Sequence, residues 1–289
     1  MEFAILGPLE VCCEGQAVAL TGPRLRMVLA ALLLEANRAV STERLVAVLW
    51  EAEPPVNARR RVQNCISDLR RALSLAGGCD VIRTDSPGYS IQLGGDQLDL
   101  AAFETGVEAG LAAGRAGRPA AAVEGLRSAL ARWRGPALDG IAGGYFESVS
   151  ARLNERRLAA TETCIDYELA IGRNDVISEL VGLTGEHPFR ERFIGQLMLA
   201  YYRSGRVADA VEAFRNLRIR LADELGLDPG HRLAELHEAI LRNDTALLAG
   251  DARAVSGLVT WRFGRCPADK PAGRGSGQAS ASGRWCQRR

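Results

Sequence analysis

The sequence lacks any long apolar run. None of its 289 residues belongs to a stretch of the roughly 18 consecutive apolar residues that a transmembrane helix needs. The first residues, MEFAILGPLEV, also lack the basic n-region of a secretory signal peptide. With 47% hydrophobic and 25% charged residues, the composition is that of a globular chain. We therefore expect a cytoplasmic protein that has no membrane contact.

The sequence also lacks the cysteine spacing of a metal site or a disulfide framework. Its cysteines are odd in number and scattered, and none forms a C-x-x-C pair. They are Cys12, Cys13, Cys65, Cys79, Cys164, Cys266 and Cys286. We interpret them as small buried hydrophobic side chains or as residues without a role, and we expect no metal and no cofactor.

Catalytic motifs are missing as well. The three histidines, His187, His231 and His237, do not form an H-E-x-x-H pair. The chain contains no G-x-S-x-G elbow and no G-x-x-x-x-G-K-[ST] phosphate loop. We predict from this that the protein is not an enzyme.

Net charge is nearly absent, but the charges are unevenly distributed. Residues 1–95 carry ten basic and ten acidic side chains, and residues 96–245 carry eighteen and twenty-three, a net charge of −5. Residues 246–289 carry eight and two, a net charge of +6, so the whole chain sums to +1. A first region without net positive charge predicts weak non-specific binding to polyanions, because that binding depends on neutralised phosphates.

The elements predicted for the first part of the chain have the order of a winged helix-turn-helix. Residues 2–20 read as short strands broken at Gly7-Pro8 and Glu14-Gly15, and a helix is expected over 24–34. Ser41 is a predicted N-cap of a second helix, which Pro54-Pro55 ends. A third helix covers 57–73, with Asn57 as its predicted cap and Gly77-Gly78 after it. Residues 81–84 and 89–93 then flank Ser86-Pro87-Gly88, which predicts a β-hairpin.

The third helix has two different faces. At about 100° per residue, one stripe is apolar, with Val62, Ile66, Leu69 and Leu73. The opposite stripe holds Arg60, Asn64, Ser67 and Arg71. The helix carries five arginines, at 59, 60, 61, 70 and 71, against one acidic residue, Asp68. Arginine pairs with guanine and phosphate, and Asn and Gln pair with adenine, so this pattern predicts a recognition helix for the DNA major groove.

This pattern predicts a role for each polar side chain. The predicted base contacts are Arg60, Gln63, Asn64 and Ser67. The predicted contacts to the DNA backbone are Arg24, Arg26, Arg61, Arg70, Arg71, Arg83 and Tyr89. The alternatives are that Arg59, Arg61 or Arg70 pairs with acids on neighbouring helices and that Tyr89 is a core anchor of the wing. Asp68 opposes the pattern, and either accepts from a cytosine amine or lowers affinity.

From residue 98 onward, helices without strands are predicted. The stretch from Ala116 to Glu124 resembles the stretch from Ser204 to Glu212, and a further Gly-Arg pair lies at 172–173, 33 residues before the pair at 205–206. This interval is close to the roughly 34-residue tetratricopeptide period, so we favour a tetratricopeptide-like array over a generic alanine-rich bundle. Residues from 246 onward are rich in Gly, Ser, Ala and Arg, which predicts a disordered basic tail, with an accessory arm for DNA as the alternative.

Long phrases of the chain resemble a known family. The run GPRLRMVLAALLLEANRAVSTERLVAVLW, followed by PP, RVQNCISDLRRAL and PGYSIQL, resembles the Streptomyces antibiotic regulatory proteins. ALARWRGPALDGI, HPFRERFIGQLMLAYYRSGRVADAVEAFRNLRIRLADELGLDPG and LAELHEAILRND resemble the bacterial transcriptional activation domain of that family. The resemblance covers about residues 2–245 and makes the chain similar to the small, single-regulator members.

The resemblance implies an α+β winged helix of the OmpR type over residues 1–95 and an all-α, tetratricopeptide-like activation domain over 96–245, before the tail at 246–289. It implies an activator of secondary-metabolite (antibiotic) gene clusters that binds direct repeats in promoter DNA near the −35 region and recruits RNA polymerase holoenzyme. A homodimer is a further expectation. The alternative is a tetratricopeptide-like adaptor whose winged helix contacts proteins instead of DNA.

Overall fold

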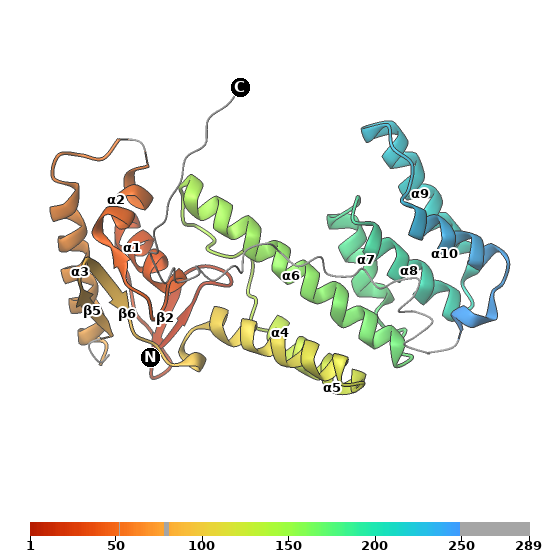
Figure 1. Cartoon of the computed structure of the whole chain (residues 1–289), viewed down its shortest axis with the longest axis horizontal. Coiled ribbons are helices and arrows are strands. Elements are labelled where there is room, and N and C mark those ends of the chain that lie inside the picture. Colours follow the sequence, from red (N-terminus) through yellow and green to blue (C-terminus); the bar gives the residue numbers. More distant parts are fainter. Residues whose placement is uncertain (52, 78–80, 249–289) are drawn as a thin grey trace, which may run out of the picture. The chain divides into compact units, whose positions relative to one another are not determined.

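The computed structural model describes residues 1–51, 53–77 and 81–248 (Figure 1). It begins with a three-stranded antiparallel sheet in the order β1-β2-β3. The strands are β1 (Glu2–Ala4), β2 (Glu10–Cys13) and β3 (Gln16–Ala17). Glu14 and Gly15, between β2 and β3, have φ angles of 49° and 80°, so the turn predicted at this dipeptide is confirmed.

A winged helix follows this sheet, in the order that the sequence predicts. Its elements are α1 (Pro23–Leu34), β4 (Val40–Ser41), α2 (Thr42–Trp50), α3 (Ala58–Leu75), β5 (Ile82–Asp85) and β6 (Gly88–Ile91). The second sheet has the order β4-β6-β5, and all its pairs are antiparallel. Figure 1 shows α3 beside the β5–β6 hairpin, which is the wing.

The capping predictions have different outcomes. The Ser41 hydroxyl accepts the backbone N–H of Arg44 at 3.1 Å, which confirms Ser41 as the N-cap of α2. Asn57 occupies the N-cap position of α3, but its side chain makes no capping hydrogen bond, so the prediction is right for the position only. Gly77, with a φ of 82°, follows α3 as expected; Gly78 lies outside the described residues.

The helical part begins after a short 3-10 turn, η1 (Gly95–Gln97). Its helices are α4 (Asp99–Arg115), α5 (Pro119–Leu130), α6 (Gly144–Ala170), α7 (Ile177–Glu186), α8 (Glu191–Arg203), α9 (Val207–Leu225) and α10 (His231–Leu241). A second 3-10 turn, η2 (Thr245–Leu247), follows α10. Most successive helices pack on one another, as α4 and α5 do in Figure 1, whereas α6 packs on α5 and α8 more than on α7.

The same turn joins three of these helix pairs. Gly117, Gly172 and Gly205 follow α4, α6 and α8 with φ angles of 72°, 79° and 75°. In each case the arginine after the glycine donates its backbone N–H to the carbonyl five residues earlier: Arg118 to Ala113, Arg173 to Glu168 and Arg206 to Tyr201, at 2.9–3.0 Å. This is the Schellman closure of a helix, which needs a left-handed residue. The repeated Gly-Arg pairs therefore mark real helix ends, and the tetratricopeptide-like interpretation is confirmed.

The first hydrophobic core continues past residue 95. Phe3, Leu29, Phe103 and Phe146 belong to it and are at most 1% exposed. They come from β1, α1, α4 and α6 in turn. The ring of Trp133, also buried, meets Phe103 edge to face at 5.4 Å. The winged helix and the helices α4 and α6 thus share one core.

Polar contacts reinforce this junction. The Asp99 carboxylate, at the start of α4, accepts the backbone N–H groups of Ile5 and Leu6, each at 2.9 Å. Burial raises the pKa of Asp99, against the effect of these hydrogen bonds and of Arg134 nearby. The backbone N–H of Arg134 donates to the Leu6 carbonyl at 2.8 Å, and the backbone N–H of Leu138 donates to the Ile5 carbonyl at 2.9 Å. The segment after β1 therefore has its hydrogen-bond partners in the helical part.

A second core is formed by the C-terminal half of α6 together with α7, α8, α9 and α10. Ile165, Phe193, Met198 and Ile240 are fully buried in it. Leu247 of η2, 5% exposed, packs there too, so the first residues of the predicted tail belong to this core. Residues 249–289, the rest of the predicted tail, lie outside the described residues.

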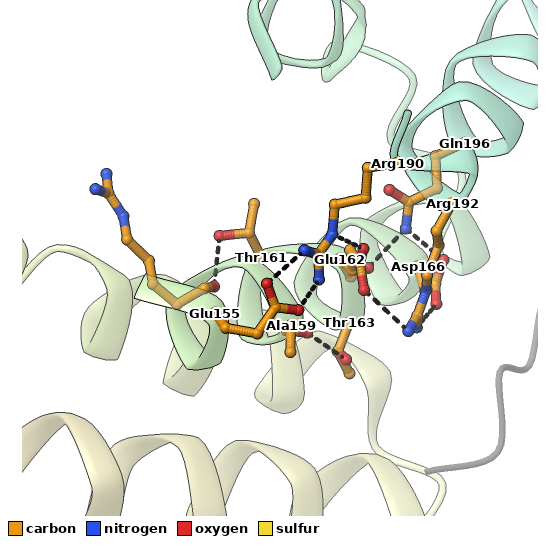
Figure 2. Close-up of polar contacts among 10 residues, drawn as sticks. Glu155, Ala159, Thr161, Glu162, Thr163, Asp166, Arg190, Arg192 and Gln196 are labelled. Carbon is orange, nitrogen blue, oxygen red and sulfur yellow. Dashed lines mark hydrogen bonds and ion pairs between the residues drawn. The ribbon is translucent and has the colours of Figure 1, made fainter. Parts of the chain in front are cut away.

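An ion cluster joins α6 to the segment that starts α8 (Figure 2). Glu162 on α6 accepts from Arg190 and from Arg192, and Asp166 accepts from Arg192 and from Gln196. The Glu162 side chain is only 6% exposed, and burial raises the pKa of Asp166. Buried charges need such partners, so this cluster fixes α8 against α6.

None of the described helices is both long enough and apolar enough to cross a membrane. Within the same residues there is no group of three metal-ligating side chains. The four described cysteines, Cys12, Cys13, Cys65 and Cys164, are free thiols, and burial together with Glu168 raises the pKa of Cys164 to about 12. Only Cys164 is fully buried; the other three are half-buried.

Candidate nucleic-acid interface

Helix α3 turns its apolar stripe inward and its polar stripe outward. Val62, Ile66, Leu69 and Leu73 are at most 2% exposed. The four predicted base contacts, Arg60, Gln63, Asn64 and Ser67, are all exposed. The Ser67 hydroxyl donates to the Gln63 carbonyl at 3.0 Å, so its oxygen can still act as an acceptor. The face that the sequence predicts for base contacts is thus available to a partner.

The arginines of α3 differ in what they contact. Arg59 pairs with Glu43 of α2 at 2.8 Å, which is the alternative considered for it from the sequence. Arg71 pairs with Asp68 at 2.6 Å. Arg60 and Arg61 are exposed and form no ion pair within residues 1–51, 53–77 and 81–248. These two guanidinium groups present their full charge to solvent.

Arg70 connects α3 to the wing. Its Nε and Nη2 donate to the Ile82 carbonyl at 3.1 and 3.0 Å, and Nη2 also donates to the Thr84 hydroxyl at 2.9 Å. Arginine suits this role because its donors form a rigid planar fork. Its side chain therefore ties the hairpin to α3, while the phosphate contact that the sequence suggests for Arg70 stays a prediction.

The start of α1 lies near the middle of α3. Arg24 is exposed and lies over the Trp50 ring at 5.7 Å, while Arg26 is half-buried. Burial and the Asp68 carboxylate raise the pKa of Cys65 on α3, and the Arg24 charge opposes this. Gly22 precedes the helix with a φ of 104°, and Pro23, which has no backbone N–H, is its first residue.

Of the two DNA-backbone contacts predicted on the wing, one is exposed to solvent. Arg83 on β5 is exposed. Tyr89 on β6 is half-buried, lies opposite Val40 and Thr84 in the sheet, and packs against the first core. Its ring therefore anchors the wing, which is the alternative that the sequence left open.

Two contacts between the α2 region and the start of α6 have no signal in the sequence. The Glu51 carboxylate, in the turn after α2, accepts the backbone N–H of Gly144 at the start of α6, at 2.7 Å. The Arg44 guanidinium of α2 lies over the Tyr145 ring at 5.0 Å. Both join residues about a hundred positions apart, so only the tertiary structure reveals that α2 is attached to α6.

The arrangement suits a DNA duplex. An α-helix fits the major groove, where guanidinium and amide groups pair with guanine and adenine edges. Charged groups on the flanks of such a helix, like Arg61, and helix N-termini such as that of α1 suit phosphates. The exposed side chains of α3, α1 and β5 are of these kinds.

Two family models match the chain. "Transcriptional regulatory protein, C terminal" matches residues 15–91, and "Bacterial transcriptional activator domain" matches residues 98–241. The first match contains the winged helix, and the second contains α4 to α10.

Known proteins share both parts. EmbR of Mycobacterium tuberculosis is 40% identical over 246 residues, which are 84% of this chain and 63% of EmbR. MoaR1 of the same organism is 38% identical, over 84% of this chain and 79% of MoaR1. The regulatory protein DnrI of Streptomyces peucetius is 37% identical, over 86% of this chain and 94% of DnrI. The chain thus spans less than two thirds of the length of EmbR.

A solved structure agrees with the fold. Mycobacterium tuberculosis EmbR, in complex with a low-affinity phosphopeptide, superposes with a TM-score of 0.82 at 38% identity, over 88% of this chain and 69% of that one. The winged helix and the tetratricopeptide-like array that follows it, with the matches above, define a transcriptional regulator of the OmpR-type winged-helix class. Among such regulators, the chain belongs to the Streptomyces antibiotic regulatory protein family.

Proposed function

We propose that this protein is a sequence-specific DNA-binding activator of transcription. The observation that supports this most directly is the exposed face of α3, where Arg60, Gln63, Asn64 and Ser67 stand opposite a fully buried apolar stripe. In the proposed complex these four side chains contact base edges, while Arg24, Arg26, Arg61, Arg71 and Arg83 contact the DNA backbone. Arg70 and Tyr89 then position the wing instead of contacting DNA.

Two variants test this division of roles. Replacing Arg60 with Ala should relax the preference for one base pair, because a good bidentate pair discriminates bases by about 1–3 kcal/mol. Replacing Arg61 with Ala should weaken binding to all sequences and reduce the slope of log K against log salt by about one. Electrophoretic mobility shifts with selected and random duplexes, over a range of salt concentrations, measure both quantities.

Equal losses on selected and random DNA in both variants would overturn these assignments. If the unaltered protein shows no preference for any sequence, the activator proposal fails. The adaptor function, in which the winged helix contacts proteins, would then be the better account.

We further propose that residues 1–95 supply the DNA contacts and that residues 96–245 supply the contacts to RNA polymerase holoenzyme. A groove of about 330 Å³ between α7, α8 and α9 supports a protein-binding role for the second region. Ile194, Leu197 and Tyr201 line it from α8, and Val181, 49% exposed, lines it from α7. Arrays of helix pairs commonly bind proteins with such surfaces.

A charge placed at the edge of this groove should separate activation from DNA binding. Val181→Asp is expected to lower activated transcription about tenfold in a purified polymerase system, because a carboxylate would be desolvated in the interface. DNA affinity should stay unchanged. Leu225→Asp, at a 53% exposed position of α9 outside the groove, is the matched control and should behave as the unaltered protein. Equal activation by both variants would exclude the groove.

The target of the regulator is also part of the proposal. The relative DnrI is named as a regulatory protein of Streptomyces peucetius, and the family resemblance implies antibiotic gene clusters. We propose that two copies of the protein bind direct repeats near the −35 region of such promoters. DNase footprinting on promoters beside the gene, with the full chain, should show protection at intervals of whole helical turns.

A further inference from the structure

Arg71 lies in the middle of the polar face of α3. At about 100° per residue, it is within about 40° of Arg60, Asn64 and Ser67 around the helix axis. Arg61 and Arg70 lie on opposite flanks of that face by the same measure. When a helix enters the major groove, the middle of its face points at the bases and its flanks point at the phosphates. The position of Arg71 is therefore that of a residue that reads a base.

The Arg71 side chain is held in place by Asp68. Its Nη2 donates to the Asp68 carboxylate at 2.6 Å, one turn earlier on the same helix. Side chains on a helix lean toward its N-terminus, so the guanidinium lies over the turn of Ser67 and Asp68, beside the predicted base contacts. Both side chains remain accessible, with 73% of Arg71 and 52% of Asp68 exposed.

This pairing disfavours a phosphate as the partner of Arg71. A carboxylate 2.6 Å from the guanidinium compensates its charge and repels a phosphate that approaches the same spot. A guanine edge carries no net charge and needs two parallel donors, for its O6 and N7. The contact to Asp68 uses one of five guanidinium N–H groups, so two parallel donors remain for the base.

We propose that Arg71 determines specificity by reading a guanine in the major groove, and that Asp68 is the positioning residue that orients it. This inference rests on the proposed DNA-binding function and changes one of its assignments: Arg71 becomes a base contact in place of a phosphate contact. It also gives the acidic residue on an otherwise basic helix a task. An arginine that is already oriented loses less rotamer freedom when it binds.

The test uses the full chain and a randomised pool of DNA duplexes. The unaltered protein selects its preferred sequence, and the affinity is then measured for duplexes that carry each base pair at each selected position. One guanine position should lose its preference, about tenfold or more, in both Arg71→Ala and Arg71→Lys, because lysine keeps the charge but not the paired donors. The salt slope should change clearly less than in Arg61→Ala.

Variants of Asp68 test whether this residue orients the Arg71 side chain or only stabilises the helix. Asp68→Ala should bind random DNA more tightly, because a negative charge is removed, and yet lose most of the preference at the same guanine position. Asp68→Asn keeps an oxygen acceptor for Arg71 and should retain most of that preference. Circular dichroism should show all variants equally folded, since both positions are exposed.

The possible outcomes separate this inference from the function on which it rests. If the unaltered protein selects no sequence, the DNA-binding function itself fails. If it selects one, but the Arg71 and Asp68 variants change the affinity for all duplexes by the same factor, Arg71 is a phosphate contact and the inference is overturned. A loss of guanine preference in Arg71→Ala with full preference in Asp68→Ala would overturn the positioning role alone.

Discussion

A Gly88→Ala variant is expected to lose about 3 kcal/mol of stability, and with it most of its DNA binding. Gly88 begins β6 and lies opposite Ser41 of β4 and Asp85 of β5. A Cβ atom built there would stand 1.9 Å from the Val40 carbonyl oxygen and 2.7 Å from the Ser41 Cα. Both are backbone atoms, so no side-chain rotation relieves the overlap and the sheet itself must separate.

Urea denaturation and hydrogen exchange measure this effect. The amides of β4 and β6 should exchange faster, because the β4–β6 pairing is lost, and the wing should lose its support. Gly182→Ala is the matched control: it lies inside α7, nothing is within 4 Å of its added Cβ, and alanine favours the helix by about 1 kcal/mol. Unchanged exchange in β4 and β6 of Gly88→Ala would contradict the predicted overlap.

Local chemistry explains the parts of the fold that the sequence predicts well. The Ser41 hydroxyl, the left-handed glycines Gly117, Gly172 and Gly205, and the apolar stripe of α3 each act within a few residues. Their signals can be read from spacing alone. These local signals predict the order of elements in the winged helix, the ends of the helices in the array and the outward face of α3.

The contacts that the sequence does not predict are those between distant residues. Arg70 has the same chemistry as Arg61 in the sequence, and only the position of β5 makes it a wing contact. Asp99 meets Ile5 and Leu6 across more than ninety residues. The shared core of β1, α1, α4 and α6 likewise crosses the boundary that a change of pattern near residue 95 suggests. Spacing carries no information about such pairings, because chain topology sets them.

Replacing Glu162 with Ala should cost about 2–3 kcal/mol, because Arg190 and Arg192 would each lose one of two carboxylate partners and keep only Glu155 and Asp166. The Glu162 side chain is 6% exposed, and that of Arg192 is 10% exposed, so water cannot replace the lost carboxylate well. Thermal unfolding followed by the helix signal in circular dichroism measures the loss. Glu162→Gln keeps the shape and one acceptor oxygen, and should lose clearly less.

The control for this change is a glutamate whose ion pair is open to water. Glu238 pairs with Arg242 one turn away at 3.3 Å, with both side chains 66% exposed, so Glu238→Ala should change stability by about 0.5 kcal/mol or less. The same α8 that Glu162 fixes to α6 supplies Ile194, Leu197 and Tyr201 to the groove. Glu162→Ala should therefore reduce activated transcription more than it reduces the affinity for DNA. Equal free energies of unfolding for Glu162→Ala and Glu238→Ala would show that the cluster contributes no more than a surface ion pair.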